Sequence, residues 1–344
     1  MGKTSKKPTL MPVILSLAIL LAIISQANAQ PQGKILVLVT APPLKSIIEE
    51  VGGEIVEARS LLPAGADPHS YEPGSRELLD AIAGASLIVM TGPHHLPVEE
   101  SIGRLREEGF IRIPVLDYRD YQEAGLILLK IPGTNISNPH GYLYSIMGIK
   151  AIAKASALEL SRMSPEHSSY FEERLRKYLE RLDSIRAKVE TMGVEEVKVV
   201  LGGPDLQYLA EDLGLRVEGF ILKAHGAEPS MGDIMIAVDA VRRGRASLIL
   251  LSDLELMENP ELTRILDEQD VPYLVIPLIE LADEPELAPV LAAALLRSSV
   301  ERDMESASAA STSVLELIAV PSLLANLILL LFLILLVMKV RRYG

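Results

Sequence analysis

The sequence predicts an α/β protein with two lobes, each built on a parallel sheet, joined by one long rigid helix, with a ligand cleft between the lobes. Two series of short β-branched runs, separated by helix-length segments, are typical of βαβ units buried on both faces of their sheets. The first series is 34–40, 87–90 and 113–116, and the second is 197–201, 217–221, 247–251 and 273–276.

A long amphipathic helix separates the two series. Ser164, Pro165 and Glu166 form a helix start with a cap and a proline in the first turn, and apolar residues then recur mostly three and four positions apart over 170–192. A helix of about 27 residues is roughly 40 Å long, so it could join the lobes as a stiff strut. We therefore expect an N-terminal lobe at 30–163, the linking helix at 164–193 and a C-terminal lobe at 194–298.

The N-terminus has the layout of a secretory signal peptide over residues 1–29. Three lysines precede an apolar stretch over 10–24, and Ala27-Asn28-Ala29 is typical of a cleavage site. The alternative is an uncleaved N-terminal anchor, because the apolar stretch is long for a signal. Both alternatives place the following domain outside the cytoplasm.

The C-terminus predicts a membrane anchor. Residues 317–338 hold no charged side chain and are followed at once by Lys339, Arg341 and Arg342, so we expect a transmembrane helix at 317–338 and a cytoplasmic tail at 339–344. The alternative is a buried core helix. The serine- and alanine-rich run at 306–313 indicates a flexible spacer, placed at 299–316. The expected location is the cell membrane, single-pass, with the N-terminal domain on the cell surface.

Composition narrows the class of protein. The whole chain has a net charge of −13, and the part between the two ends holds 27 basic and 46 acidic residues, a net charge of −19. Such a surface repels nucleic acid, although acidic faces are also common for solubility alone. The sequence has no cysteine, so it offers no disulfide, no thiolate for a metal and no lipid-carrying cysteine. We expect a monomer that binds no nucleic acid.

The informative histidines lie in loops. His69 follows Asp67-Pro68 and His140 follows Asn138-Pro139; a preceding proline restricts the backbone, and a loop of fixed geometry can hold an imidazole toward a cleft as a metal ligand. A surface or hydrogen-bonded histidine is the alternative for each. We expect a structural or surface role for His94 and His95, which follow the run at 87–90, a solvated position for His167, and a loop position of uncertain direction for His225.

Enzyme motifs are missing from the sequence. We find no nucleophile elbow, no Walker loop, no dinucleotide-binding fingerprint and no HExxH helix. The sequence therefore favours a protein that binds without turnover, and we assign it no catalytic residue and no resident cofactor.

The chain resembles the zinc- and manganese-binding substrate-binding proteins of ABC transporters. The similarity runs from about Lys34 to Leu296 and is most specific over 61–92, where the Pro-Gly loop with Asp-Pro-His resembles the first-ligand segment of the family. NPHGYLY at 138–144 resembles the second-ligand segment. The resemblance implies two lobes joined by a long helix, one divalent metal ion between them, and ABC permease and ATPase subunits as partners.

The chain departs from the family at two of the four ligands. The third, His or Glu, falls near Gly203, and the fourth, an acidic residue, falls near Ile276. Only His69 and His140 match, and Zn usually takes four ligands. Either other residues substitute, or water completes a weak site, or metal binding is lost. The candidate substitutes are Asp205, His225, Asp253 and Glu280, and His225 is included in the expected metal site.

Three functional classes follow. The first is a membrane-anchored receptor that captures a divalent ion of the Zn or Mn class and delivers it to an ABC permease. The second keeps the fold with a degenerate metal site and acts as a binding or adhesion module for another ligand or protein. The third is a metal-dependent surface hydrolase, which needs an acidic general base that the sequence does not mark.

Overall fold

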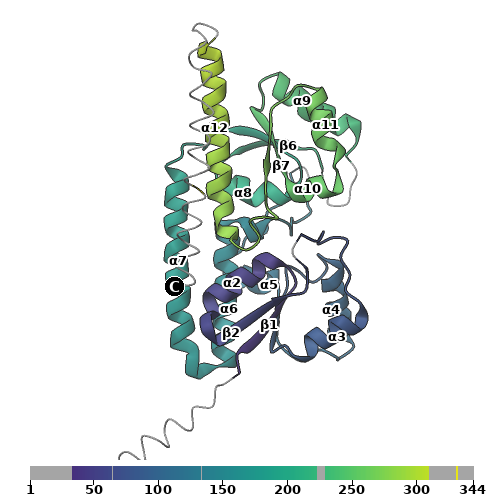
Figure 1. Cartoon of the computed structure of the whole chain (residues 1–344), viewed down its shortest axis with the longest axis vertical. Coiled ribbons are helices and arrows are strands. Elements are labelled where there is room, and N and C mark those ends of the chain that lie inside the picture. The colour runs from purple at the N-terminus through teal and green to yellow at the C-terminus, as the bar shows by residue number, and fades with distance from the viewer. Residues whose placement is uncertain (1–32, 64, 133, 223–228, 310–330, 332–344) are drawn as a thin grey trace, which may run out of the picture.

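The computed structural model describes residues 33–63, 65–132, 134–222, 229–309 and 331. Two four-stranded sheets organise the chain, and every strand pair in them is parallel. The strand orders are β2-β1-β3-β4 and β6-β5-β7-β8. Two α/β lobes with parallel sheets are therefore confirmed, and Figure 1 shows them one above the other.

The first sheet contains one strand that the sequence analysis did not predict. Its strands are β1 (Ile35–Val39), β2 (Val56–Ser60), β3 (Leu87–Val89) and β4 (Val115–Leu116). The missed strand is β2, an edge strand in which Val56 and Ala58 are buried while Glu57 and Arg59 are exposed. Alternating burial gives an edge strand no continuous apolar run, whereas such runs mark the other strands of the sheet. The helices of this lobe are α2 (Pro42–Gly52), η1 (Gly53–Ile55), α3 (Ser75–Ala83), α4 (Pro97–Glu107), α5 (Tyr118–Glu123), η2 (Tyr142–Tyr144) and α6 (Ile146–Met163).

The second sheet agrees with all four expected strands. They are β5 (Lys198–Leu201), β6 (Arg216–Phe220), β7 (Leu248–Ser252) and β8 (Tyr273–Ile276). β7 is buried along its whole length, because helices cover both faces of a central parallel strand. The helices of this lobe are η4 (Pro204–Leu206), α8 (Gln207–Asp212), α9 (Met231–Arg242), α10 (Asp253–Glu258), α11 (Glu261–Glu268), η5 (Pro285–Leu287) and α12 (Ala288–Ala309).

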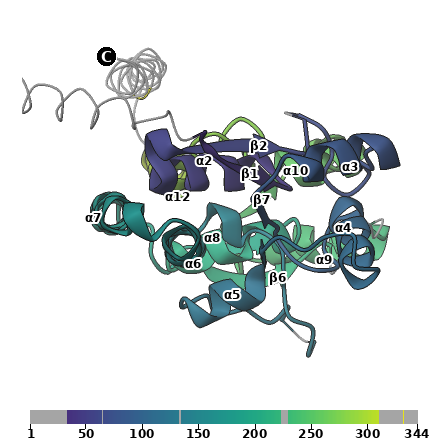
Figure 2. The ribbon, with the colours of Figure 1, turned by 90° about the horizontal axis from the view of Figure 1, so that it is seen from below.

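One helix extends along both lobes. After the short turn η3 (Pro165–His167), α7 runs from Ser168 to Glu190, and in Figure 1 it follows the long axis of the molecule beside both lobes. It packs against α6, as Figure 2 shows from below, and against α2 and α12. Phe171, Tyr178, Leu182 and Val189 form its buried stripe. The long connecting helix of the sequence analysis is present, and the residue boundaries given there for the lobes stay predictions.

The C-terminal expectations fall largely on residues outside the described part. α12 continues to Ala309, so residues 299–309 of the segment expected as a flexible spacer are helical, while the bounds of the spacer stay a prediction. The expected transmembrane segment at 317–338 and the tail at 339–344 lie outside the described residues, apart from Leu331, and so does the expected signal peptide. Among the helices that the structure describes, none is long and apolar enough to cross a bilayer.

A charge cluster fixes α7 to its neighbours. The Arg181 guanidinium lies 3.1 Å from Oε1 of Glu50 in α2 and 3.0 Å from Oε1 of Glu286 in η5, and it sits 4.7 Å above the ring of Tyr178. Glu286 is buried, and burial raises the pKa of its carboxyl. This one guanidinium therefore compensates a buried carboxylate and ties the first and last parts of the fold to the connecting helix.

We expect Arg181→Ala to lower the free energy of unfolding by at least about 2 kcal/mol, because it leaves the Glu286 carboxylate buried without its counter-charge. Arg176→Ala is the matched control on the same helix. Among the described residues, Arg176 pairs with the exposed Glu173 and Glu180 of its own helix, and such pairs contribute below about 1 kcal/mol. Urea denaturation of the full-length protein in detergent measures both, and equal losses would contradict this role of Arg181.

Candidate metal centre

A cavity of about 130 Å³ lies between the two lobes. The N-terminal lobe contributes His69, His95 and His140, and the C-terminal lobe contributes Asp205, Asp283 and an apolar wall that includes Leu254 and Leu278. A cleft between the lobes is therefore present. Its three histidines come from the N-terminal lobe, on the side of the carboxyl ends of the parallel strands, which is the usual place for a ligand in such sheets.

The two x-Pro-His loops share one local geometry. Oδ1 of Asp67 accepts a hydrogen bond of 2.9 Å from the backbone N–H of His69, and Oδ1 of Asn138 accepts one of 2.9 Å from that of His140. Each is an Asx turn, in which a short side chain bonds the backbone two residues later. The proline between fixes the backbone of the turn, so each loop holds its histidine in place by the same means.

Asn138 also binds the opposite lobe. It is completely buried, and its Nδ2 donates to the carbonyl oxygen of Pro204 at 2.9 Å and to Oε1 of Gln207 at 2.8 Å. The hydroxyl of Tyr208 donates to the Asn138 carbonyl oxygen at 2.6 Å. An aspartate could form the turn but has no N–H to donate, so the amide at 138 has a second role that the sequence pattern did not reveal.

His95 joins the two predicted histidines. It follows β3 and its Nε2 lies 2.7 Å from Nδ1 of His140, while its Nδ1 lies 2.6 Å from Oγ1 of Thr91. The sequence favoured a structural or surface role for His95, because no local pattern distinguishes it from its neighbour His94. In the structure His94 is exposed and His95 is partly buried. The only signal available from sequence was the position of both residues after a strand.

The three imidazoles form one cluster. One nitrogen from each of His69, His95 and His140 lies within 4.8 Å of the others. The ring centroid of His69 lies 5.5 Å from that of His95 and 5.5 Å from that of His140, and the centroids of His95 and His140 are 4.3 Å apart. Tetrahedral zinc with Zn–N bonds near 2.05 Å places its nitrogens about 3.3 Å apart. A bound ion would therefore increase the 2.7 Å distance between the His95 and His140 nitrogens by about 0.6 Å and replace the proton between them.

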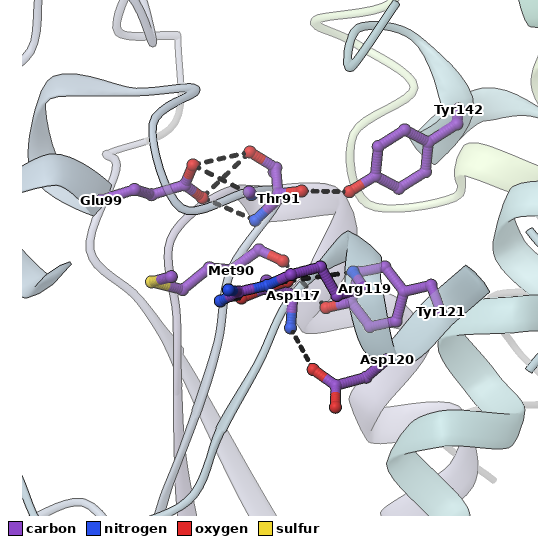
Figure 3. Close-up of polar contacts among 9 residues, drawn as sticks. Met90, Thr91, Glu99, Asp117, Arg119, Asp120, Tyr121 and Tyr142 are labelled. Atoms are coloured by element: carbon purple, nitrogen blue, oxygen red, sulfur yellow. Dashed lines mark hydrogen bonds and ion pairs between the residues drawn. The ribbon is translucent and has the colours of Figure 1, made fainter. Parts of the chain in front are cut away.

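A buried carboxyl supports the loop that carries His95. Glu99, at the third position of α4, accepts hydrogen bonds from Thr40 and from the backbone N–H groups of Thr91, Gly92 and Leu96. Thr91 also donates to it through Oγ1 (Figure 3). Burial raises the pKa of Glu99 to about 7, while the bonds from Thr40, Thr91 and Gly92 act in the opposite direction. The loop between β3 and α4 folds around this carboxyl, so that three of its backbone N–H groups donate to the carboxyl oxygens.

The expected substitutes for the missing ligands have different positions. Asp205 is buried and lines the cavity. Asp253 instead accepts hydrogen bonds from the backbone N–H groups of Leu278 and Ile279, and burial together with its hydrogen bond to Glu280 raises its pKa to about 6. Asp253 and Glu280 are thus engaged with each other beside the loop after β8. His225 lies outside the described residues, so its place in the site stays a prediction.

A side chain at position 203 would come too close to the carboxylate of Glu255. A Cβ at Gly202 would lie 2.3 Å from Oε2 of Glu255, and a Cβ at Gly203 would lie 2.8 Å from its Oε1. Glu255 is buried and accepts a hydrogen bond from the Ser252 N–H. Its carboxylate occupies the space that a side chain after β5 would need, so the C-terminal lobe offers no ligand at that position.

Comparison with known proteins identifies the family. The family described as zinc-uptake complex component A, periplasmic (ZnuA) matches residues 37–275. The manganese ABC transporter substrate-binding lipoprotein PsaA of Streptococcus mitis is 25% identical over 218 residues, which cover 61% of this chain and 70% of that protein. The zinc-binding lipoprotein AdcA of Streptococcus pneumoniae (strain ATCC BAA-255 / R6) is 23% identical over 264 residues, which cover 70% of this chain and 50% of that protein.

Solved structures share the fold. A crystal structure of ZnuA superposes with a TM-score of 0.63 at 22% identity, covering 76% of this chain and 98% of that one. The substrate-binding protein FpvC of Pseudomonas aeruginosa, in complex with Mn²⁺, gives 0.64 at 22% identity, covering 78% and 99%. Because the family match extends over more than half of the sequence, the chain belongs to the ZnuA family of periplasmic zinc-uptake components.

Proposed function

We propose that this chain is the substrate-binding protein of an ABC transporter, capturing one divalent metal ion of the Zn or Mn class and delivering it to a permease and its ATPase. The observation that carries the proposal is the convergence of His69, His95 and His140 on one point of the cleft. Neutral imidazole is a common ligand for such ions. Family membership and the named manganese- and zinc-binding relatives support the same function.

The proposed site differs from the one that the resemblance implied. All three imidazoles come from the N-terminal lobe, with His95 taking the role of the third ligand that Gly203 cannot supply. Asp205 is the best-placed fourth ligand, because it lines the same cavity and its backbone touches the His140 loop: a Cβ on Gly141 would lie 1.9 Å from the Asp205 carbonyl oxygen. A set of three nitrogens and one oxygen suits Zn and does not exclude Mn.

A binding module with a degenerate metal site is the alternative function. It was suggested by two missing ligands out of four. The three-histidine cluster weakens that reason, because the N-terminal lobe alone brings three nitrogen donors within reach of one ion. We propose binding without turnover, as suits a solute-binding component of a transporter.

Membrane attachment through the C-terminal segment is part of the proposal. The named relatives PsaA and AdcA are lipoproteins, whereas the 344 residues of this chain contain no cysteine to carry a lipid. The uncharged run at 317–338 and the basic residues after it would supply the anchor instead, with the two lobes outside the cytoplasm. We also propose that the segment 1–29 is removed as a signal peptide.

We expect the metal-stripped full-length protein in detergent to bind Zn²⁺ or Mn²⁺ with one-to-one stoichiometry and sub-micromolar affinity in calorimetric titration. His69→Ala, His95→Ala and His140→Ala should each weaken binding roughly 100-fold or more, because each removes a bond to the ion. His94→Ala is the matched control and should change nothing, since His94 is exposed beside the site.

Two results would count against this site. An absence of saturable binding would leave the fold with another ligand, and equal effects of His94→Ala and His95→Ala would remove His95 from the set. His225→Ala in the same series decides whether that residue contributes.

We expect Asp205→Asn to weaken metal binding roughly tenfold or more, because an amide oxygen is a poorer ligand than a carboxylate for a divalent ion. Asp283→Asn is the control, since Asp283 is a second carboxylate that lines the same cavity. The same titration measures both. If the Asp283 variant loses affinity and the Asp205 variant does not, the oxygen ligand has been assigned to the wrong residue.

We expect the full chain to remain in the membrane fraction after alkaline carbonate washing and a variant ending at residue 309 to be released, because only the former carries the uncharged run. Immunoblots of the two fractions measure the outcome. Retention of the shortened variant would place the anchor at the N-terminus. In that case N-terminal sequencing of the protein should give a sequence that starts within the first few residues of the chain instead of at Gln30.

A further inference from the structure

Thr91 contacts both loops that carry the paired histidines. It lies after β3 and is 1% exposed. Its Oγ1 lies 2.6 Å from Nδ1 of His95, and its carbonyl oxygen accepts a hydrogen bond from the hydroxyl of Tyr142, two residues after His140 (Figure 3). Thr91, which is not one of the proposed ligands, therefore contacts His95 directly and contacts the segment that carries His140 through Tyr142.

The hydroxyl proton of Thr91 is directed at Glu99. Oγ1 of Thr91 lies 2.9 Å from both Oε1 and Oε2 of the carboxyl, and the backbone N–H of Thr91 donates to Oε1 at 2.6 Å. In its ionised form the Glu99 carboxylate can only accept, so the bond between the two side chains is then donated by Thr91. A hydroxyl has a single proton, and this geometry commits it to Glu99.

The remaining bond of Thr91 then has only one possible direction. Because its proton points to Glu99, Oγ1 can only accept from His95, which requires the proton of the neutral imidazole to be on Nδ1. In a neutral ring the other nitrogen, Nε2, then carries the lone pair. Nε2 is also the atom that faces His140 at 2.7 Å, on the side where the three rings converge.

We propose that Thr91 is a positioning residue that fixes the Nδ1–H tautomer of His95, so that Nε2 is presented to the metal ion. The inference rests on the proposed metal-binding function and extends it. Without the threonine hydroxyl, the ring could place its proton on Nε2 and donate it to His140, and the lone pair needed for the ion would point at Thr91 instead. Partners of this kind set the tautomer and orientation of metal-bound histidines.

Three substitutions separate this role from a purely structural one. Thr91→Val keeps the shape of the side chain and removes the hydroxyl, and Thr91→Ser restores the hydroxyl. Thr40→Val is the matched control: Thr40 is completely buried and donates through Oγ1 to the same Glu99 oxygen, and no hydrogen bond joins it to His95. Both valine variants therefore remove one hydroxyl donor from one carboxyl, and only one of them removes the partner of the imidazole.

The first measurement is the tautomer of His95 in the metal-free full chain in detergent, by ¹⁵N NMR with labelled histidine at about pH 8.5, where histidine side chains are neutral and the Glu99 carboxyl is ionised. His95→Ala assigns the signals. We expect Nδ1–H in the wild type, in Thr91→Ser and in Thr40→Val, and a mixed or Nε2–H ring in Thr91→Val. An Nε2–H ring in the wild type overturns the proposal without any variant, so a misfolded Thr91→Val would not leave it untested.

The second measurement is the affinity for Zn²⁺ in calorimetric titration. Thr91→Val should weaken binding by about 10- to 100-fold, while Thr91→Ser and Thr40→Val should stay within about threefold of the wild type. Equal affinities of the two valine variants would overturn the role of Thr91. If the wild type itself binds no metal, the proposed function fails, and the tautomer measurement still decides the proposal about Thr91.

Discussion

The side chain of Asn138 joins the two lobes through hydrogen bonds. Its oxygen fixes the turn that carries His140, and its nitrogen donates to Pro204 and Gln207 of the other lobe. Because the amide is completely buried, losing any of these bonds would leave a polar group without compensation in a dry environment. The orientation of one proposed ligand and the approach of Asp205 to the site therefore depend on the same small group.

The two lobes repeat one arrangement with different outcomes. In each, the helix after the third strand along the sequence carries a buried glutamate at its third position, Glu99 in α4 and Glu255 in α10. In the first lobe the carboxyl collects hydroxyl and amide donors and supports the loop with His95. In the second it lies against Gly202 and Gly203 and excludes a side chain there. The same buried group thus supports the loop of a proposed ligand in one lobe and occupies the space of a side chain in the other.

A metal held by His69, His95 and His140 would be bound by one lobe, with the other supplying an oxygen and an apolar wall. Capture would then need little relative movement of the lobes. The connections between the lobes agree with that view, since α7 extends along both of them, the Arg181 cluster fixes it on both sides, and Asn138 crosses the cleft. A site assembled within one lobe can form on a scaffold that hardly closes.

The sequence by itself determined seven of the eight strands in the described part of the chain, the long helix and the turns that hold His69 and His140, because each depends on neighbours along the chain. Continuous apolar runs mark buried parallel strands, and an Asx turn needs only three residues. Only the tertiary structure decided the positions of β2, His95 and Thr91 relative to their partners. β2 is a strand because its partner β1 is beside it, and His95 meets His140 across 45 positions of sequence. No local pattern encodes such a meeting, because it arises only when the folded chain brings the loop after β3 beside the segment between α5 and η2.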